Sequence, residues 1–301
     1  LGTTVLRFAG GYFADFYHWR DGIGPRAARP NRRHDIGDAE SPNNFGTDEL
    51  LDFGNRTGAR LMLQANIISG TPQEAVEWLQ YIRDGGNLDR VAYWELGNEQ
   101  YLRDGSPLST VISRTPEQYV QIARPFANAL RAEDPNARIL AVAGETIGPS
   151  IIGNYPGWYR IVLQGLAADI HGLAIHNAYY PVMVNDQGET VEQVYRALLA
   201  APLQVKENLR QVDAQIRAHA PAHADRLKLA ITEWGPLFHI YPDSRWVDHV
   251  RTLGSALYAA SVLKVFIDDP RVEAANHFKL SDQIFMGMLS SISKNPRAAY
   301  F

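Results

Sequence analysis

The sequence predicts an α/β protein with a TIM (β/α)8-type barrel, and three observations carry this prediction. The chain has 301 residues, a length common for a barrel built as one domain. Short apolar runs rich in β-forming residues alternate with longer segments of helical periodicity. The apolar runs are continuous, as expected for parallel strands that helices cover.

Seven segments qualify as strands. In chain order they are TTVLRFAG (3–10), ARLMLQAN (59–66), RVAYWEL (90–96), ARILAVAG (137–144), GLAIHNAYY (172–180), LKLAITEW (227–234) and VEAANHFKL (272–280). A doubly wound sheet is the competing fold, but it usually carries a glycine-rich phosphate loop after an early strand. The segment FAGGYFAD lacks the GxGxxG spacing of that loop, so the barrel is favoured.

Three helices between these strands have readable ends. The first is predicted over 71–86, with Thr71 as N-cap, Glu74 three residues later and two glycines at its end. Another begins at the cap Thr115. A third covers 190–220 and is either long or broken around Pro202.

The segment 20–46 is rich in glycine, proline, asparagine and charge, and it reads as one long irregular loop. Since it follows the first strand, we expect it over the carboxyl-terminal face of the barrel, where active sites of this fold lie.

Composition excludes several classes of function. The net charge of −4 offers no basic footprint, so no nucleic-acid partner is expected. No stretch approaches the roughly 20 apolar residues that cross a bilayer, so a soluble chain without a membrane partner is expected. Zero cysteines leave the compartment, cytoplasmic or secreted, open. The histidines show no HExxH or similar spacing, and neither a metal nor a cofactor is expected.

Two predicted strands end in glutamate, Glu99 after WELGN and Glu233 in ITEW. A glutamate at a strand end is often a solvated or salt-bridged rim residue. Two of them at one barrel mouth can instead hydrolyse a glycosidic bond, because one protonates the leaving oxygen while the other attacks or stabilises the anomeric carbon. Glu95 lies deeper on the same side of its strand and is expected to be structural, and Glu145 is expected to line the rim.

The motifs around these glutamates resemble a known group of enzymes. WELGNE and ITEWG resemble the acid/base and nucleophile motifs of the retaining glycoside hydrolases of clan A. The segments LRFAGGYFADFYHWRDGIGPRAARP, NNFGTDEL and SGTPQEAVEWLQY resemble family 51 of that clan, the α-L-arabinofuranosidases. The resemblance runs in order from Leu6 to about Glu233.

The resemblance implies a role for several residues. Glu99 would be the general acid/base and Glu233 the nucleophile, while Asn98 would bind the sugar 2-hydroxyl. Arg7 would lie beneath the nucleophile, where its charge would favour the ionised carboxylate. The remaining substrate-binding candidates are His176, Tyr179 or Tyr180, Trp234, Trp19 and Tyr12.

Three positions depart from the family pattern, one of them around Gly37, where the family has a tryptophan. Ala9 replaces the usual proline, and Tyr12 stands where a small polar residue normally touches the furanose. The acid/base and nucleophile pair depends less on these positions than arabinofuranose specificity does.

The strand count suggests an incomplete barrel. Glu99 ends the third predicted strand but the family's fourth, and Glu233 ends the sixth but the family's seventh. We therefore expect residues 1–301 to form a single catalytic barrel domain that lacks the first strand and last helix. A fragment of a longer chain with an accessory β-sandwich explains this, and a strand supplied from elsewhere is the alternative. Family members often form oligomers, which implies a homo-oligomer.

These points predict a retaining glycosidase that removes terminal α-L-arabinofuranosyl residues from plant-type polysaccharides or oligosaccharides. One alternative is another clan A hydrolase, such as a β-xylosidase, a glucuronidase or an endo-glucanase. A carbohydrate-binding barrel without turnover is the other.

Overall fold

The structure is a computed structural model that describes residues 2–33, 40–103, 105–144, 155–176, 179, 181–183, 186–236, 238–239, 245–282 and 289–290. The chain divides into two compact units. The first consists of Leu1–Ala174 and His219–Lys228, and the second of Ile175–Ala218 and Leu229–Phe301.

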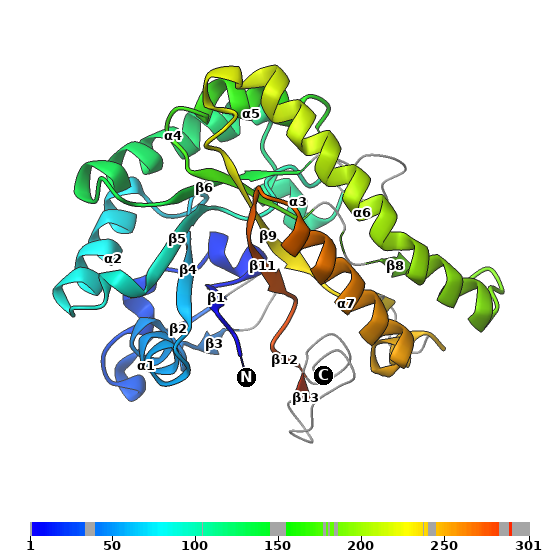
Figure 1. Ribbon diagram of the computed structural model, residues 1–301. Coiled ribbons are helices and arrows are strands. Elements are labelled where there is room, and N and C mark those ends of the chain that lie inside the picture. The colour runs from blue at the N-terminus through cyan, green and yellow to red at the C-terminus, as the bar shows by residue number, and fades with distance from the viewer. Residues whose placement is uncertain are drawn as a thin grey trace. The chain divides into compact units, whose positions relative to one another are not determined.

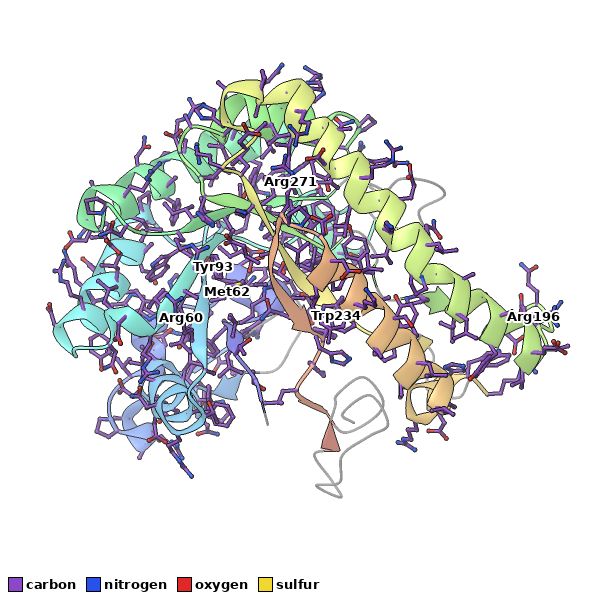
Figure 2. The ribbon with its side chains drawn as sticks, viewed as in Figure 1. Arg60, Met62, Tyr93, Arg196, Trp234 and Arg271 are labelled. Atoms are coloured by element: carbon purple, nitrogen blue, oxygen red, sulfur yellow. The ribbon has the colours of Figure 1, made fainter. Side chains whose placement is uncertain are left out.

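The first unit contains a parallel sheet with helices along it. Its strands follow the order β1 (Val5–Phe8), β4 (Arg60–Ala65), β5 (Val91–Leu96), β6 (Ile139–Ala143) and β7 (Gly172–Ile175), the last of which ends at the first residue of the second unit. Its helices are α1 (Thr47–Thr57), α2 (Pro72–Asp84), α3 (Pro107–Ile112), α4 (Pro116–Glu133) and α5 (Trp158–Leu166). The pairs β1–β4, β4–β5 and β5–β6 are parallel, and Met62 of β4 lies beside Tyr93 of β5 (Figure 2).

The second unit contains two long helices and two strands that pair in parallel. They are α6 (Val191–His219), β9 (Lys228–Trp234), α7 (Leu253–Asp268) and β11 (Val272–His277). Four two-residue strands accompany them: β8 (Val182–Met183), β10 (Phe238–His239), β12 (Ser281–Asp282) and β13 (Leu289–Ser290).

Each of the seven predicted strands contains one strand of the structure, so this prediction is confirmed. The physical reason is burial, because β4, β5, β6 and β9 are buried along almost their whole length. Continuous apolar runs are needed where helices cover the strands. In the first unit, α2, α4 and α5 lie along one side of β4, β5 and β6 (Figure 1).

The predicted helix starts are also confirmed. The Thr71 side chain accepts a hydrogen bond from the Glu74 N–H, and the Thr115 side chain accepts one from the Gln118 N–H. The helix with Pro202 is continuous over 29 residues, which resolves the choice between a long and a broken helix.

The prediction of one irregular loop over 20–46 is wrong for the described part of this segment. Residues 31–32 and 41–42 form the antiparallel pair β2 (Asn31–Arg32) and β3 (Ser41–Pro42). Two 3-10 turns, at Trp19–Gly22 and Arg26–Ala28, precede this pair. The reason is local hydrogen bonding, since the buried Arg29 guanidinium donates to the Gly24 and Asn43 carbonyls.

Among the described residues, no helix is long and apolar enough to cross a membrane.

Candidate active site

The turn that follows β5 holds Asn98 and Glu99 in an uncommon backbone conformation. The strand ends at Leu96, and Gly97 then takes a positive φ of 83°, which glycine tolerates. Glu99 also has a positive φ, 52°, and among the described residues it is the non-glycine residue with this geometry. A left-handed backbone costs about 1–2 kcal/mol for an ordinary residue. Such outliers cluster at functional sites.

The half-buried Glu99 carboxylate accepts a hydrogen bond from a neighbouring phenol. The Tyr101 hydroxyl donates to Glu99 Oε1 over 3.2 Å. The Tyr101 ring packs so tightly against Gly144 that a Cβ there would lie 2.5 Å from it. On another side the ring meets Trp158 edge-to-face at 5.8 Å. The phenol is thus fixed by packing, and it orients the carboxylate.

A buried ion pair orients Asn98. The Arg7 Nε donates to Glu95 Oε2 over 2.6 Å, and its Nη2 donates to Glu95 Oε1 over 3.1 Å. The same Nη2 donates to Asn98 Oδ1 over 2.7 Å. Glu95 and Asn98 are both buried, so the pair needs these bonds to offset desolvation. Arg7, from β1, therefore fixes the amide next to Glu99.

Gln64 connects this turn to the loop after β1. Its Oε1 accepts from the Gly10 N–H over 2.6 Å, and its Nε2 donates to the Gly97 carbonyl over 3.3 Å. Tyr12 follows in the same loop and is 41% exposed. Trp19 is buried instead, and its Nε1 donates to the Glu74 carbonyl over 3.0 Å. In this conformation Trp19 is a packing residue.

In the second unit, Glu233 lies near the end of β9 with an imidazole beside it. Its side chain is 8% exposed, and His176 Nε2 lies 3.9 Å from Glu233 Oε1. His176 is buried and follows directly after β7. A protonated imidazole at this distance would stabilise negative charge on the carboxylate.

Tyr179 is a packed residue with its polar atoms engaged. Its hydroxyl donates to Asn208 Oδ1 of α6, and its carbonyl accepts from the Tyr258 hydroxyl over 2.8 Å. The Tyr179 ring lies 5.6 Å from that of Phe266. Tyr180 and Glu145 lie outside the described residues.

Trp234 comes after Glu233, and its ring contacts two other rings. His277, its register partner on β11, meets it edge-to-face at 5.2 Å, and Phe266 does so at 5.4 Å. Its Nε1 is buried and has no hydrogen-bond partner in the part of the chain that the structure describes. Burial lowers the pKa of His277 to about 4, so this imidazole is neutral near pH 7.

Within the first unit, then, the structure brings together Arg7, Asn98 and Glu99, and within the second unit His176 and Glu233. Sequence reasoning did not name Tyr101 or Gln64. Gln64 had a signal, because it is a polar residue within the otherwise apolar run LMLQA. Tyr101 had none, since its packing against Gly144 is not visible in the sequence. The expectation of no metal or cofactor stays a prediction.

Comparisons with known proteins connect this chain to one family. The family model described as "Alpha-L-arabinofuranosidase 1 domain" matches residues 1–179. A relative from Emericella nidulans named "Alpha-L-arabinofuranosidase C" is 28% identical over 291 residues, which is 89% of this chain and 55% of the relative.

Solved structures show the same fold. The α-L-arabinofuranosidase of Thermotoga maritima, solved as an arabinose complex, is 24% identical with a TM-score of 0.74. The match covers 95% of this chain and 56% of the Thermotoga chain. A family 51 α-L-arabinofuranosidase from Bifidobacterium longum is 19% identical with a TM-score of 0.77. The match covers 99% of this chain and 62% of the Bifidobacterium chain. The chain thus spans little more than half the length of these proteins. The predicted α/β barrel fold is confirmed.

Proposed function

The chain belongs to the α-L-arabinofuranosidases of glycoside hydrolase family 51, in clan A, and we propose from this that it is a retaining glycosidase acting on terminal α-L-arabinofuranosyl residues. The substrates would be plant-type polysaccharides or oligosaccharides. The Thermotoga maritima relative was solved as an arabinose complex, which supports arabinose as the sugar released.

The observation that carries the proposal is the geometry of Glu99. Its backbone is left-handed, its carboxylate accepts from Tyr101, and its neighbour Asn98 is fixed by Arg7. A packing role would not require a glutamate in a conformation that glycine or asparagine adopts at lower cost. A proton donor that must be held at one place does require such positioning.

In the proposed mechanism, a Glu233 carboxylate oxygen attacks the anomeric carbon. The bond from that carbon to the leaving oxygen breaks, and Glu99 gives this oxygen its proton. Water then attacks the anomeric carbon of the glycosyl-enzyme. Glu99 takes a proton from the water as the ester bond to Glu233 breaks. Arabinose is released, and both glutamates return to their starting protonation states.

Three neighbouring residues would support these steps. His176, 3.9 Å from Glu233, would hold the nucleophile in position. Asn98 would bind the sugar 2-hydroxyl, with its amide turned by Arg7. The placement of Arg7 beneath Glu233 also remains part of the proposal.

The first test replaces each glutamate by alanine and measures hydrolysis of 4-nitrophenyl α-L-arabinofuranoside. We expect Glu233→Ala and Glu99→Ala to lower kcat/KM by at least about 10²- to 10⁴-fold. Azide should restore turnover of Glu99→Ala on an activated substrate and give the glycosyl azide, because azide attacks the glycosyl-enzyme without a general base. Glu117→Ala, on the exposed side of α4, is the matched control and should keep wild-type activity.

The second test follows the anomeric signals of the first product by NMR, which should show retained configuration. A preference for a pyranoside over the α-L-arabinofuranoside would favour another clan A hydrolase. If the wild-type protein binds arabino-oligosaccharides but does not cleave any glycoside, the carbohydrate-binding barrel is the better explanation.

A further inference from the structure

Asp15 is a fully buried carboxyl group that the proposed mechanism does not use. It ends the 3-10 helix η1 (Gly11–Asp15) in the loop after β1. Aspartate is rarely buried completely unless it is paired. Here both carboxyl oxygens accept from the Nε2 of Gln100, Oδ1 over 3.0 Å and Oδ2 over 2.9 Å. Gln100 is also fully buried, and it directly follows Glu99.

The Gln100 side chain fills the space beneath the turn that carries Glu99. A Cβ added to Gly97 would lie 2.5 Å from Gln100 Oε1 and 2.7 Å from Gln100 Nε2. The main chain of Gln100 is held as well, because its carbonyl accepts from the Arg114 N–H over 2.8 Å. The turn from Gly97 to Gln100 therefore wraps around an amide that Asp15 holds from below.

We propose that Asp15 is a positioning residue for Glu99. By anchoring the Gln100 amide, it holds residue 99 in its left-handed conformation and keeps the Glu99 carboxyl at one place. The inference rests on the proposed role of Glu99 as general acid/base. It extends that role to a residue 84 positions away in the sequence, on a different loop.

The surroundings of Asp15 shift its pKa in both directions. Burial raises the pKa of Asp15 well above its ordinary value, and the negative charge of Glu95 raises it further. Arg114, the hydrogen bond from Gln100 and Arg7 act in the opposite direction. The geometry itself is one amide nitrogen shared by both carboxyl oxygens, which holds the Gln100 side chain in one orientation.

This pairing predicts which substitutions are tolerated. Asparagine at position 15 keeps an oxygen that can accept from Gln100 Nε2, whereas leucine has similar volume and offers no acceptor. We therefore expect Asp15→Asn to keep the turn and Asp15→Leu to release it.

The experiment compares the purified variants on two aryl α-L-arabinofuranosides, one with a dinitrophenyl leaving group and one with an unsubstituted phenyl group. The phenyl substrate needs proton donation, and the dinitrophenyl substrate needs little. We expect Asp15→Leu to lower kcat/KM, which reports formation of the glycosyl-enzyme, on the phenyl substrate by about 10²-fold, the size of loss that a misplaced catalytic group produces. On the dinitrophenyl substrate the loss of kcat/KM should stay within about threefold, while azide should raise kcat because hydrolysis of the glycosyl-enzyme also needs Glu99 as base. Asp15→Asn should stay close to wild type on both substrates.

Three further variants make the outcome decisive. Gln100→Met removes the amide with little change in volume and should reproduce the effect of Asp15→Leu, so it carries the test if Asp15→Leu does not fold. Thr47→Val removes a buried hydrogen bond to Trp78 elsewhere in the first unit, and it should show no leaving-group dependence. Glu99→Gln tests the proposed function itself. It should lower kcat/KM for the phenyl substrate far more than kcat/KM for the dinitrophenyl substrate.

Two failures are distinguishable. If Glu99→Gln slows both substrates equally, the acid/base role of Glu99 is wrong. If Glu99→Gln shows the leaving-group dependence but Asp15→Leu and Gln100→Met slow both substrates equally or neither, Glu99 is the acid and Asp15 does not position it.

Discussion

Glu99 has a backbone conformation that its own side chain disfavours, and this permits a test of stability separate from catalysis. Glycine accepts a positive φ without steric cost, but alanine does not. We expect Glu99→Gly to be about 1 kcal/mol more stable than Glu99→Ala in urea unfolding. Both variants lose the carboxylate and its bond with Tyr101, so their difference isolates the backbone.

The same pair of substitutions at Glu117 is the control. Glu117 lies in the first turn of α4 and is exposed, so glycine there should be less stable than alanine by roughly 0.5–1 kcal/mol. If alanine is more stable than glycine at position 99, as it should be at position 117, the backbone of residue 99 is not strained.

His277 should make the protein sensitive to mild acid. Burial lowers its pKa from 6.5 to about 4, so between these values the unfolded chain binds a proton that the folded chain does not. Stability should therefore rise from pH 4 to pH 6.5 and fall as pH drops through that window. In His277→Gln this part of the pH dependence should be lost, as measured by the free energy of unfolding at several pH values. His219→Gln is the control, because His219 ends α6 and is only half-buried.

For single residues, the sequence predicted only those positions that a local pattern marks. The places of Glu99 and Glu233 follow from strand ends, which apolar runs mark clearly. The left-handed backbone of Glu99 had no signal, because glutamate is not a residue that favours it. The Asp15–Gln100 pair joins residues of different loops, and no local pattern predicts such a contact. The assignment of Asn98 and His176 as binding residues stays a prediction.

Among the elements, α1 is held by an ion pair that should govern stability in acid. Arg29 Nη2 donates to Glu49 Oε1 over 2.9 Å, and the Gly46 N–H donates to Glu49 Oε2 over 3.0 Å. The hydrogen bond from Arg29 is the main cause that lowers the pKa of Glu49 from 4.5 to about 2. The stabilisation is therefore complete above pH 4.5 and is lost as pH falls through 2.

We expect Glu49→Gln to lower the free energy of unfolding at pH 7 by about 2 kcal/mol, since the Arg29 guanidinium is nearly buried. The difference from wild type should shrink as the pH approaches 2. Glu192→Gln removes an exposed pair with Arg196 on α6, and this control should cost no more than about 0.5 kcal/mol. Equal costs for the two substitutions would show that the Arg29–Glu49 pair contributes no more than a surface pair.

The elements themselves were largely predictable, for physical reasons. Buried strands require continuous apolar runs, and caps such as Thr71 and Thr115 have specific chemistry. The pair β2–β3 was missed because two-residue strands have no periodicity to detect. The continuity of α6 through Pro202 could not be predicted, since proline permits both a kink and a break.

For the molecule as a whole, the two compact units are interleaved along the chain. Residues 219–228 belong to the first unit but lie in the sequence between two segments of the second. Neither unit is therefore a continuous piece of chain, as independently folding domains usually are. One catalytic domain over residues 1–301 stays a prediction.

We expect one cooperative unfolding transition, with a calorimetric enthalpy equal to the van't Hoff enthalpy. Circular dichroism and tryptophan fluorescence should report the same midpoint. Two separated transitions would contradict a single domain.

The family could be identified from the sequence because its motifs are long and occur in order, and the match over residues 1–179 confirms it. The sugar could not be identified in the same way. We expect specificity to depend on side chains such as Tyr12, and contacts between a side chain and a substrate depend on tertiary arrangement rather than on local pattern.

The left-handed backbone of Glu99 also has a consequence for protein engineering. A library at position 99 that is screened only for resistance to heat should enrich glycine and asparagine, and every clone gained this way would have lost the proposed proton donor. Selection for thermostability in this protein should therefore keep residue 99 fixed, or should include turnover in every round.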